Sequence, residues 1–131
     1  MSVTARVIAG AIALAAMTGF ANAQLSPQWE SCTGNPGIDW DQQIISCSAL
    51  IQSGDESTEN LAIAFYNRGL AYENKEDYAR AIADYSGAIR LDPNDAEAFF
   101  YRSLDKARMG DKAGAAADMA AAIRINPNIG K

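Results

Sequence analysis

The feature that most constrains the fold is a self-similarity at a fixed interval in the second half of the chain. The segment AIRLDPN, which begins at Ala88, returns almost unchanged as AIRINPN from Ala122. An aromatic residue, two charged residues and a proline recur at the same interval. The matched pairs are Phe65 and Phe99, Arg68 and Arg102, Asp84 and Asp118, and Pro93 and Pro127. These pairs are 34 residues apart, and a period of this length indicates a helical repeat whose units bury their faces on one another.

Each copy of the repeat predicts a pair of helices. Apolar and aromatic residues recur at helical spacing over 61–74 and 78–91, around the polar turn NKEDY. The second copy repeats this pattern over 97–109 and 113–125. Each second helix stops before a proline, because the residue preceding a proline is pushed out of the helical region. We therefore expect an all-α chain of antiparallel helical hairpins, with full units at 61–95 and 96–131.

A third, incomplete copy lies upstream. The stretch DWDQQIISCSALIQ, from Asp39, aligns with DYARAIADYSGAIR, from Asp77, which predicts the second helix of a partial unit. The dipeptide SP ahead of it is typical of a helix start, and TGNPG is typical of a turn. We expect residues 24–60 to form a partial hairpin followed by a polar loop, SGDESTEN. Cys32 would then end its short first helix and Cys47 would lie in its second.

The segment 1–23 has the pattern of a secretory signal peptide. One early cation precedes an apolar run, and the segment ends in Ala-Asn-Ala, a small-x-small cleavage pattern. The alternative is a membrane anchor, but the apolar run has about half of the ~20 residues that a spanning helix needs. We expect cleavage after Ala23, a periplasmic or secreted bacterial protein, and no membrane association after cleavage.

The charge of the mature chain argues against nucleic acid as a partner. Loss of the signal segment removes one arginine and leaves 10 lysines and arginines against 16 acidic residues, a net charge of −6. The chain has no run of basic residues that could track a phosphate backbone.

The two cysteines fit an exported protein. Cys32 and Cys47 are the only pair in the chain, and the periplasm is oxidising. Their spacing matches neither a metal site nor a C-x-x-C redox motif. We predict a disulfide between them, and two reduced, buried thiols are the alternative.

Residues that would carry catalysis are scarce. The chain has no histidine, which removes the commonest general base and the commonest metal ligand. It also has no glycine-rich phosphate loop. We expect no enzyme activity, no cofactor and no metal. The repeated pairs Arg68–Asp84 and Arg102–Asp118 should lie on facing helices of one hairpin, and a structural ion pair is a simpler interpretation than a ligand-binding role.

The stretch AFYNRGLAYENKEDYARAIADYSGAIRLDPND resembles a tetratricopeptide repeat. The positions that carry the resemblance are Phe65, Gly69, Tyr72, Ala81, Tyr85, Ala88 and Pro93. The second copy departs from the pattern at Ser103, Lys106 and Met119. The front end C…CSALI also resembles that of exported bacterial members of the family. The resemblance implies a short solenoid of about two full repeats plus a partial N-terminal repeat.

The resemblance also implies a binding face. In tetratricopeptide proteins the first helix of each unit lines a concave groove that holds a peptide. The corresponding candidates here are Tyr66, Asn67, Leu70, Asn74, Phe100, Tyr101, Leu104 and Arg108, with Ile63 and Glu97 beside them. We expect a scaffold for a protein or peptide partner. The alternative is that these side chains coat an open face without binding.

The last predicted helix suggests a different function. In AGAAADMAAAIRI, the residues Ala116, Met119, Ala120 and Ile123 fall three and four apart on one side. Only NIGK follows Pro127, so we expect no covering helix. The alternative to a peptide scaffold is therefore a self-associating structural unit, with a homodimer as its simplest form. A monomer with a frayed last turn is the competing expectation.

Overall fold

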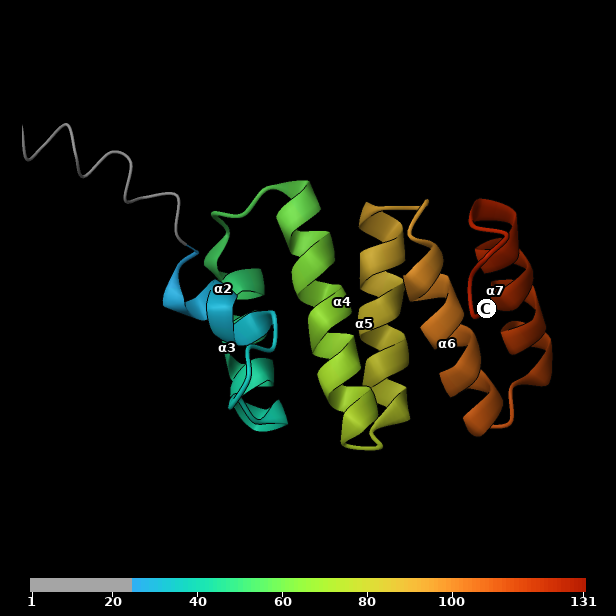
Figure 1. Cartoon of the computed structure of the whole chain (residues 1–131), viewed down its shortest axis with the longest axis horizontal. Coiled ribbons are helices and arrows are strands. Elements are labelled where there is room, and N and C mark those ends of the chain that lie inside the picture. Colours follow the sequence, from blue (N-terminus) through green and yellow to red (C-terminus); the bar gives the residue numbers. More distant parts are fainter. Residues whose placement is uncertain (1–24) are drawn as a thin grey trace, which may run out of the picture.

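The computed structural model describes residues 25–131, which form six helices and no strand. These helices are α2 (Pro27–Cys32), α3 (Trp40–Ser53), α4 (Thr58–Asn74), α5 (Tyr78–Leu91), α6 (Ala96–Arg108) and α7 (Lys112–Ile125). Helices α3 to α7 stand side by side in a row, and each packs on its neighbours along the chain (Figure 1). The predicted all-α solenoid of stacked hairpins is confirmed. The predicted signal peptide, 1–23, lies outside the described residues.

Each of the six helices begins at a side chain that caps its free backbone N–H groups. The capping residues are Ser26, Asp39, Ser57, Asp77, Asp95 and Asp111. Three of them, Asp39, Asp77 and Asp111, cap the second helix of their hairpins. Their positions are the ones that the alignment of the three copies brings together. The structure therefore places the incomplete upstream copy in the register that its sequence predicts.

Helix α4 begins earlier than expected. The apolar pattern predicts a start at residue 61, whereas the helix starts at Thr58 because the Ser57 hydroxyl accepts a hydrogen bond from the Asn60 N–H. The polar loop before it is correspondingly short. It leaves α3 through Gly54, which has a left-handed backbone conformation with φ of 75°.

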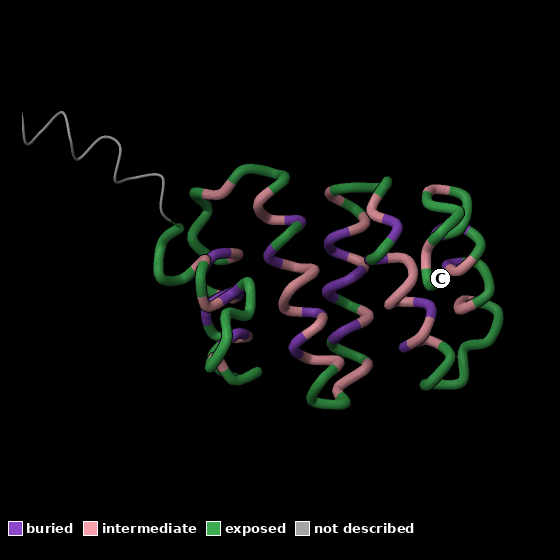
Figure 2. The backbone as a smooth tube through the Cα atoms, viewed as in Figure 1, coloured by how far each residue is buried: buried purple, intermediate pink, exposed green. Residues whose placement is uncertain are grey.

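The main core forms where α4, α5 and α6 meet. Its buried members are Ala81, Tyr85, Ala88 and Ala98. The close approach of α4 and α5 requires Gly69, since a Cβ at this position would lie 2.9 Å from the ring of Tyr85. Figure 2 shows buried residues recurring along both helices and exposed residues at their turns. Small residues on one helix thus make room for an aromatic residue on the next.

A second, smaller core closes the N-terminal hairpin. Cys32, the last residue of α2, and Cys47, in α3, form the predicted disulfide and are both fully buried. Leu50 and Ala64 complete the buried cluster, with Trp29 packed against it. The bridge therefore ties the short helix α2 to α3 and fixes the surface on which α4 packs.

Within the described range, no helix is both long enough and apolar enough to cross a bilayer.

Candidate functional site

The repeated arginine and aspartate form the predicted ion pairs. Arg68 in α4 holds both carboxylate oxygens of Asp84 in α5, at 2.8 and 2.7 Å. The pair is not a surface pair, because its side chains are 18% and 6% exposed. The hydrogen bonds that Arg68 donates to Asp84 raise the pKa of Arg68, so the guanidinium stays charged. We assign this pair to the framework that supports the site.

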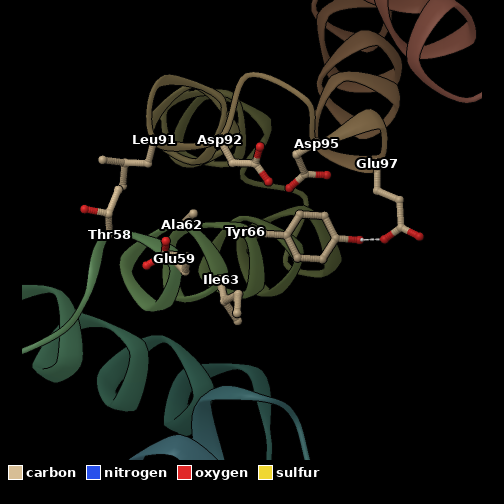
Figure 3. Close-up of a pocket in the computed structure, with 9 residues that line it drawn as sticks. All are labelled: Thr58, Glu59, Ala62, Ile63, Tyr66, Leu91, Asp92, Asp95 and Glu97. Atoms are coloured by element: carbon tan, nitrogen blue, oxygen red, sulfur yellow. Dashed lines mark hydrogen bonds between the residues drawn. The ribbon is translucent and has the colours of Figure 1, made fainter.

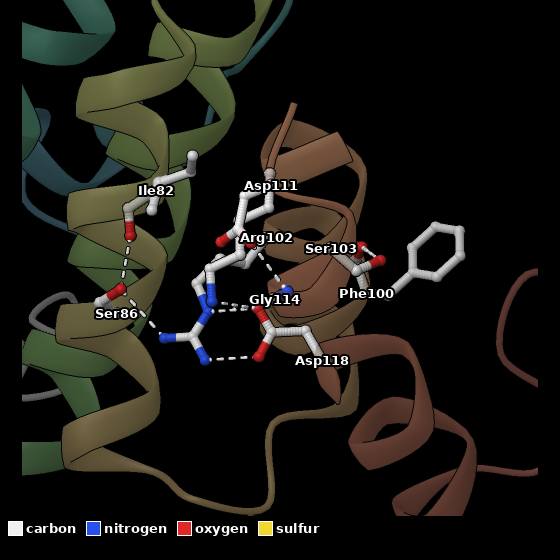
Figure 4. Close-up of polar contacts among 9 residues, drawn as sticks. Ile82, Ser86, Phe100, Arg102, Ser103, Asp111, Gly114 and Asp118 are labelled. Atoms are coloured by element: carbon white, nitrogen blue, oxygen red, sulfur yellow. Dashed lines mark hydrogen bonds and ion pairs between the residues drawn. The ribbon is translucent and has the colours of Figure 1, made fainter. Parts of the chain in front are cut away.

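The same arginines also join neighbouring units, which the sequence analysis did not predict. The remaining Nη1 of Arg68 donates to the Ser48 hydroxyl in α3 at 3.0 Å, and that of Arg102 donates to Ser86 in α5 at 3.0 Å. Figure 4 shows Arg102 between Ser86 and Asp118. The alignment of the upstream copy with the first full unit also pairs Ser48 with Ser86, so the signal was present in the sequence.

A local ion pair explains why Lys106 departs from the repeat pattern. Its Nζ lies 2.9 Å from Asp118, so this carboxylate has both Arg102 and Lys106 as partners. Burial opposes its ionisation, but the two cations hold the pKa of Asp118 below its usual value. In the first unit the same position is Tyr72, which packs under the guanidinium of Arg80.

The candidate binding face lies between α4 and α6. Both helices pack on α5, and long side chains connect them to each other. The rings of Tyr66 and Tyr101 are 6.2 Å apart, and the Tyr66 hydroxyl donates to Glu97 at 2.9 Å. Burial, followed by the bond to Glu97, raises the pKa of Tyr66, so its phenol stays protonated. We call the surface around these contacts the α4–α6 face.

A second set of contacts connects the ends of the same two helices. Arg108 donates from Nη1 to Glu73 and to Asp105, both at 2.9 Å, and its guanidinium lies over the ring of Tyr78. Glu73 also accepts the hydroxyl of Tyr85 at 2.8 Å. Arg108 was predicted as a groove residue; its side chain is 45% exposed, and its charge is paired with Glu73 and Asp105 of the same chain.

The other predicted groove residues divide into two groups. Leu70 and Tyr101 are half-buried and pack against the main core, so they contribute to stability as well as to the surface. Asn67 and Asn74 each donate to the carbonyl oxygen four residues earlier in α4. These bonds hold the two amides on α4.

The two remaining groove candidates lie on α6. Leu104 is half-buried. Phe100 is also half-buried, and a Cβ at Gly130 would lie 2.9 Å from its ring. The structure thus brings Tyr66 and Tyr101 together, whereas Phe100 contacts the segment that follows α7.

Sequence reasoning did not single out Asp105. This residue is fully buried, and its Oδ2 has no hydrogen-bond partner among the described residues. Burial and the nearby charge of Glu73 raise the pKa of Asp105 to about 6, against the opposing effect of Arg108. Its repeat equivalent is Ala71, which is equally buried. The sequence signal that could have identified Asp105 was the change from alanine in the first unit to aspartate at the equivalent position of the second.

A cavity of about 420 Å³ opens at the start of the α4–α6 face. Its residues are Thr58, Glu59, Ala62, Ile63, Tyr66, Leu91, Asp92, Asp95 and Glu97. Figure 3 shows the Tyr66 ring in the middle of this set, with its hydroxyl on Glu97. Three of these residues, Ile63, Tyr66 and Glu97, belong to the predicted groove. The acidic side chains around them were not predicted as a group.

The four predicted self-association residues lie on α7. Ala116, Ala120 and Ile123 are exposed, and Met119 is half-buried. In the described part of the chain, no group of three or more histidine, cysteine or acidic side chains is arranged to hold a metal ion.

Comparison with known proteins identifies the fold. The family model of the tetratricopeptide repeat matches residues 62–95, which span most of α4, all of α5 and the turn after it. The chain therefore contains a tetratricopeptide repeat at 62–95, as the sequence predicts. Repeats of this family typically form non-catalytic scaffolds for protein–protein interaction. A search of curated proteins found no match to the chain.

Proposed function

We propose that this protein is a non-catalytic scaffold, exported to the periplasm or secreted, that binds a segment of a partner protein on its α4–α6 face. The observation that carries the proposal is the combination of an open cavity with Ile63 and Tyr66 on one side of α4. Aromatic and aliphatic groups supply binding energy at protein interfaces, and adjacent amides supply hydrogen bonds to a peptide backbone.

The rigidity of this face favours binding over a passive surface role. Tyr66 is held by Glu97 and by the neighbouring rings of Tyr85 and Tyr101. Side chains that are already ordered lose little conformational entropy when a partner binds. Two full units offer a contact area below that of standard interfaces, so we expect a dissociation constant in the micromolar range, about −8 kcal/mol.

Site-specific photocrosslinking in cells tests this proposal. A photoreactive amino acid at position 63 lies on the proposed face, and the same group at position 83, an exposed site on α5, is the control. We expect a discrete crosslinked partner from position 63 and none from position 83. Equal crosslinking from both positions, or none from position 63, would contradict the assignment.

The location has its own test. We expect the mature protein to start at Gln24 and to appear in the periplasmic or secreted fraction, as determined by mass spectrometry of its N-terminal peptide. A full-length chain retained in the cytoplasm would contradict export.

A second candidate function is self-association through α7. Its exposed residues Ala116, Ala120 and Ile123 are the repeat equivalents of Ile82, Ser86 and Ile89 in α5. That face of α5 receives α6, since Ser86 binds Arg102 and Ile89 packs on the core. Helix α7 therefore presents a face of the kind that binds another helix.

One substitution favours a second copy of this chain as the occupant. Position 120 is alanine, whereas Ser48 and Ser86 accept the arginine of the following unit. Another unit of the same type would find no hydroxyl for its arginine at Ala120. Two α7 helices related by a two-fold axis need no hydroxyl at position 120, because their alanines allow close apolar contact. Two-fold symmetry is also the commonest symmetry of homo-oligomers.

A further inference from the structure

The cavity on the α4–α6 face has an apolar interior and an acidic rim. Ala62, Ile63 and Leu91 supply aliphatic surface, and Tyr66 supplies an aromatic one. Four carboxylates surround them, from Glu59 on α4 and from Asp92, Asp95 and Glu97 around the α5–α6 connection (Figure 3). Among the described residues that line this cavity there is no lysine or arginine.

The negative charge at Asp92 exceeds what the fold requires. Asp92 accepts the Asn94 N–H at 3.1 Å, and its equivalent in the second unit, Asn126, accepts the Asn128 N–H at 3.0 Å. An amide therefore performs the same turn-forming role without charge.

The other acidic positions of the rim also fail to recur. The second-unit equivalents of Asp95 and Glu97 are Ile129 and Lys131, and that of Tyr66 is Phe100. The combination of a tyrosine and acidic residues is thus specific to this junction and is not a requirement of the repeat.

The carboxylate of Asp95 is placed where its charge is costly. Burial raises the pKa of Asp95, and the charges of Asp92 and Glu97 raise it further, against the effect of the Ala98 N–H that Asp95 caps. Close acidic groups with apolar walls produce a concentrated negative potential, because the walls limit screening by water. A cation in the cavity would relieve this repulsion.

We propose that this cavity receives a basic side chain, a lysine or an arginine, from the partner segment. The inference rests on the proposed binding function and specifies the chemistry of the partner. The aliphatic stem would lie along Ala62 and Ile63, as long basic side chains do on apolar surfaces. The charged head would reach the rim carboxylates and the face of the Tyr66 ring. The volume of about 420 Å³ accommodates one such side chain with water.

NMR titration of the isotopically labelled mature chain tests the proposal with a defined probe. The probe is acetyl-tetraarginine amide, and the matching neutral peptide contains citrulline in place of arginine. The test variant combines Glu59→Gln with Asp92→Asn, which removes two rim charges and keeps an acceptor at each position. The control variant combines Glu30→Gln with Asp55→Asn. Both variants remove two negative charges and so change the net charge equally. Glu30 matches Glu59 because each is an exposed acid in the first turn of its helix.

We expect saturable shifts of the amide signals of residues 58–66 with the arginine peptide and none with the citrulline peptide. The test variant should raise the dissociation constant about tenfold, as expected for two partly exposed ion pairs. The control variant should change it less than about twofold. An equal loss in both variants would show attraction by overall charge and overturn the proposal, as would the absence of saturable shifts at the cavity. Spermidine that binds the cavity as tightly as the peptide would overturn the assignment of a protein side chain.

Photocrosslinking separates this inference from the proposed function. If the partner trapped from position 63 is also trapped with equal efficiency in the Glu59→Gln/Asp92→Asn variant, the scaffold function stands and the basic side chain is wrong. If the arginine peptide binds as expected but no partner is trapped from position 63, the cavity chemistry stands and the proposed scaffold function is wrong.

Discussion

Arg102 donates a hydrogen bond of 3.0 Å to the hydroxyl of Ser86, a residue of the preceding unit. The other side of the same guanidinium holds Asp118 in its own hairpin. One arginine therefore connects three helices, α5, α6 and α7. Arg68 repeats the arrangement with Ser48 and Asp84. The coupling between units in this solenoid depends on a polar contact as well as on apolar packing.

The first prediction concerns this junction. Ser86→Ala should lower the free energy of unfolding by about 1–2 kcal/mol, because a partly buried charged donor loses its acceptor. Ser48→Ala should have a similar effect at the other junction. Denaturant unfolding measures the loss, and hydrogen exchange should show α6 and α7 opening before α4 and α5 in Ser86→Ala. Unchanged stability and unchanged exchange in both variants would contradict a coupling role.

Most of the fold follows from the sequence because the two full units repeat the same pattern of apolar, capping and helix-ending residues. The period identifies the hairpins, and a capping aspartate and a closing proline mark the ends of the second helices. The disulfide follows from a single cysteine pair in a chain predicted to be exported. The start of α4 at Thr58 was missed, because the polar residues STEN resemble a loop and the cap at Ser57 outweighs that pattern.

The site was less predictable, because it depends on contacts between units. A family resemblance locates the first helices, but it does not indicate that Arg108 is bound by Glu73 and Asp105. The acidic rim combines α4 with the α5–α6 connection, which lies a full helix further along the chain. Periodicity describes which residues share a face of one helix. It does not describe which side chains from different units meet.

The second prediction concerns the buried carboxylate of Asp105. Its pKa rises from 3.8 to about 6 in the folded chain, so the folded state binds more protons than the unfolded state between these values. Stability from this residue should therefore fall as the pH rises from about 4 to about 6. Asp105→Ala, which copies Ala71 of the first unit, should raise the free energy of unfolding above pH 6 by about 1–3 kcal/mol.

The pH dependence separates this effect from a general change in packing. At pH 4 the Asp105→Ala variant should show no gain over the wild type, because Asp105 is then protonated and neutral in the folded chain. Asp105→Asn should behave similarly while retaining the volume of the side chain. Thermal unfolding from pH 4 to pH 8 measures both variants. A gain of equal size at all pH values would show that the charge of Asp105 is not the cause.

The third prediction compares the turns within the two full units. Glu76 has a left-handed backbone conformation, with φ of 60°, and its repeat equivalent is Gly110, with φ of 87°. Residues with a side chain are strained in this region, whereas glycine is not. Glu76→Gly should therefore raise the free energy of unfolding by about 0.5–1 kcal/mol, and Gly110→Ala should lower it by a similar amount. Calorimetry measures both changes. A loss of stability in Glu76→Gly would contradict strain at this turn.

The last prediction concerns α7. If its exposed stripe is an interface, the mature chain should shift from monomer to dimer in sedimentation experiments between micromolar and near-millimolar concentration. Ile123→Glu should keep it monomeric, because half of the Ile123 side chain is exposed and its burial in the dimer would contribute about 1 kcal/mol per chain. Ile63→Glu is the matched control, since Ile63 and Ile123 are both 47% exposed. The control should dimerise like the wild type, because Ile63 lies on α4. A wild-type chain that stays monomeric over the whole range would exclude the α7 homodimer, and equal loss in both variants would show that the added charge, not the α7 face, controls association.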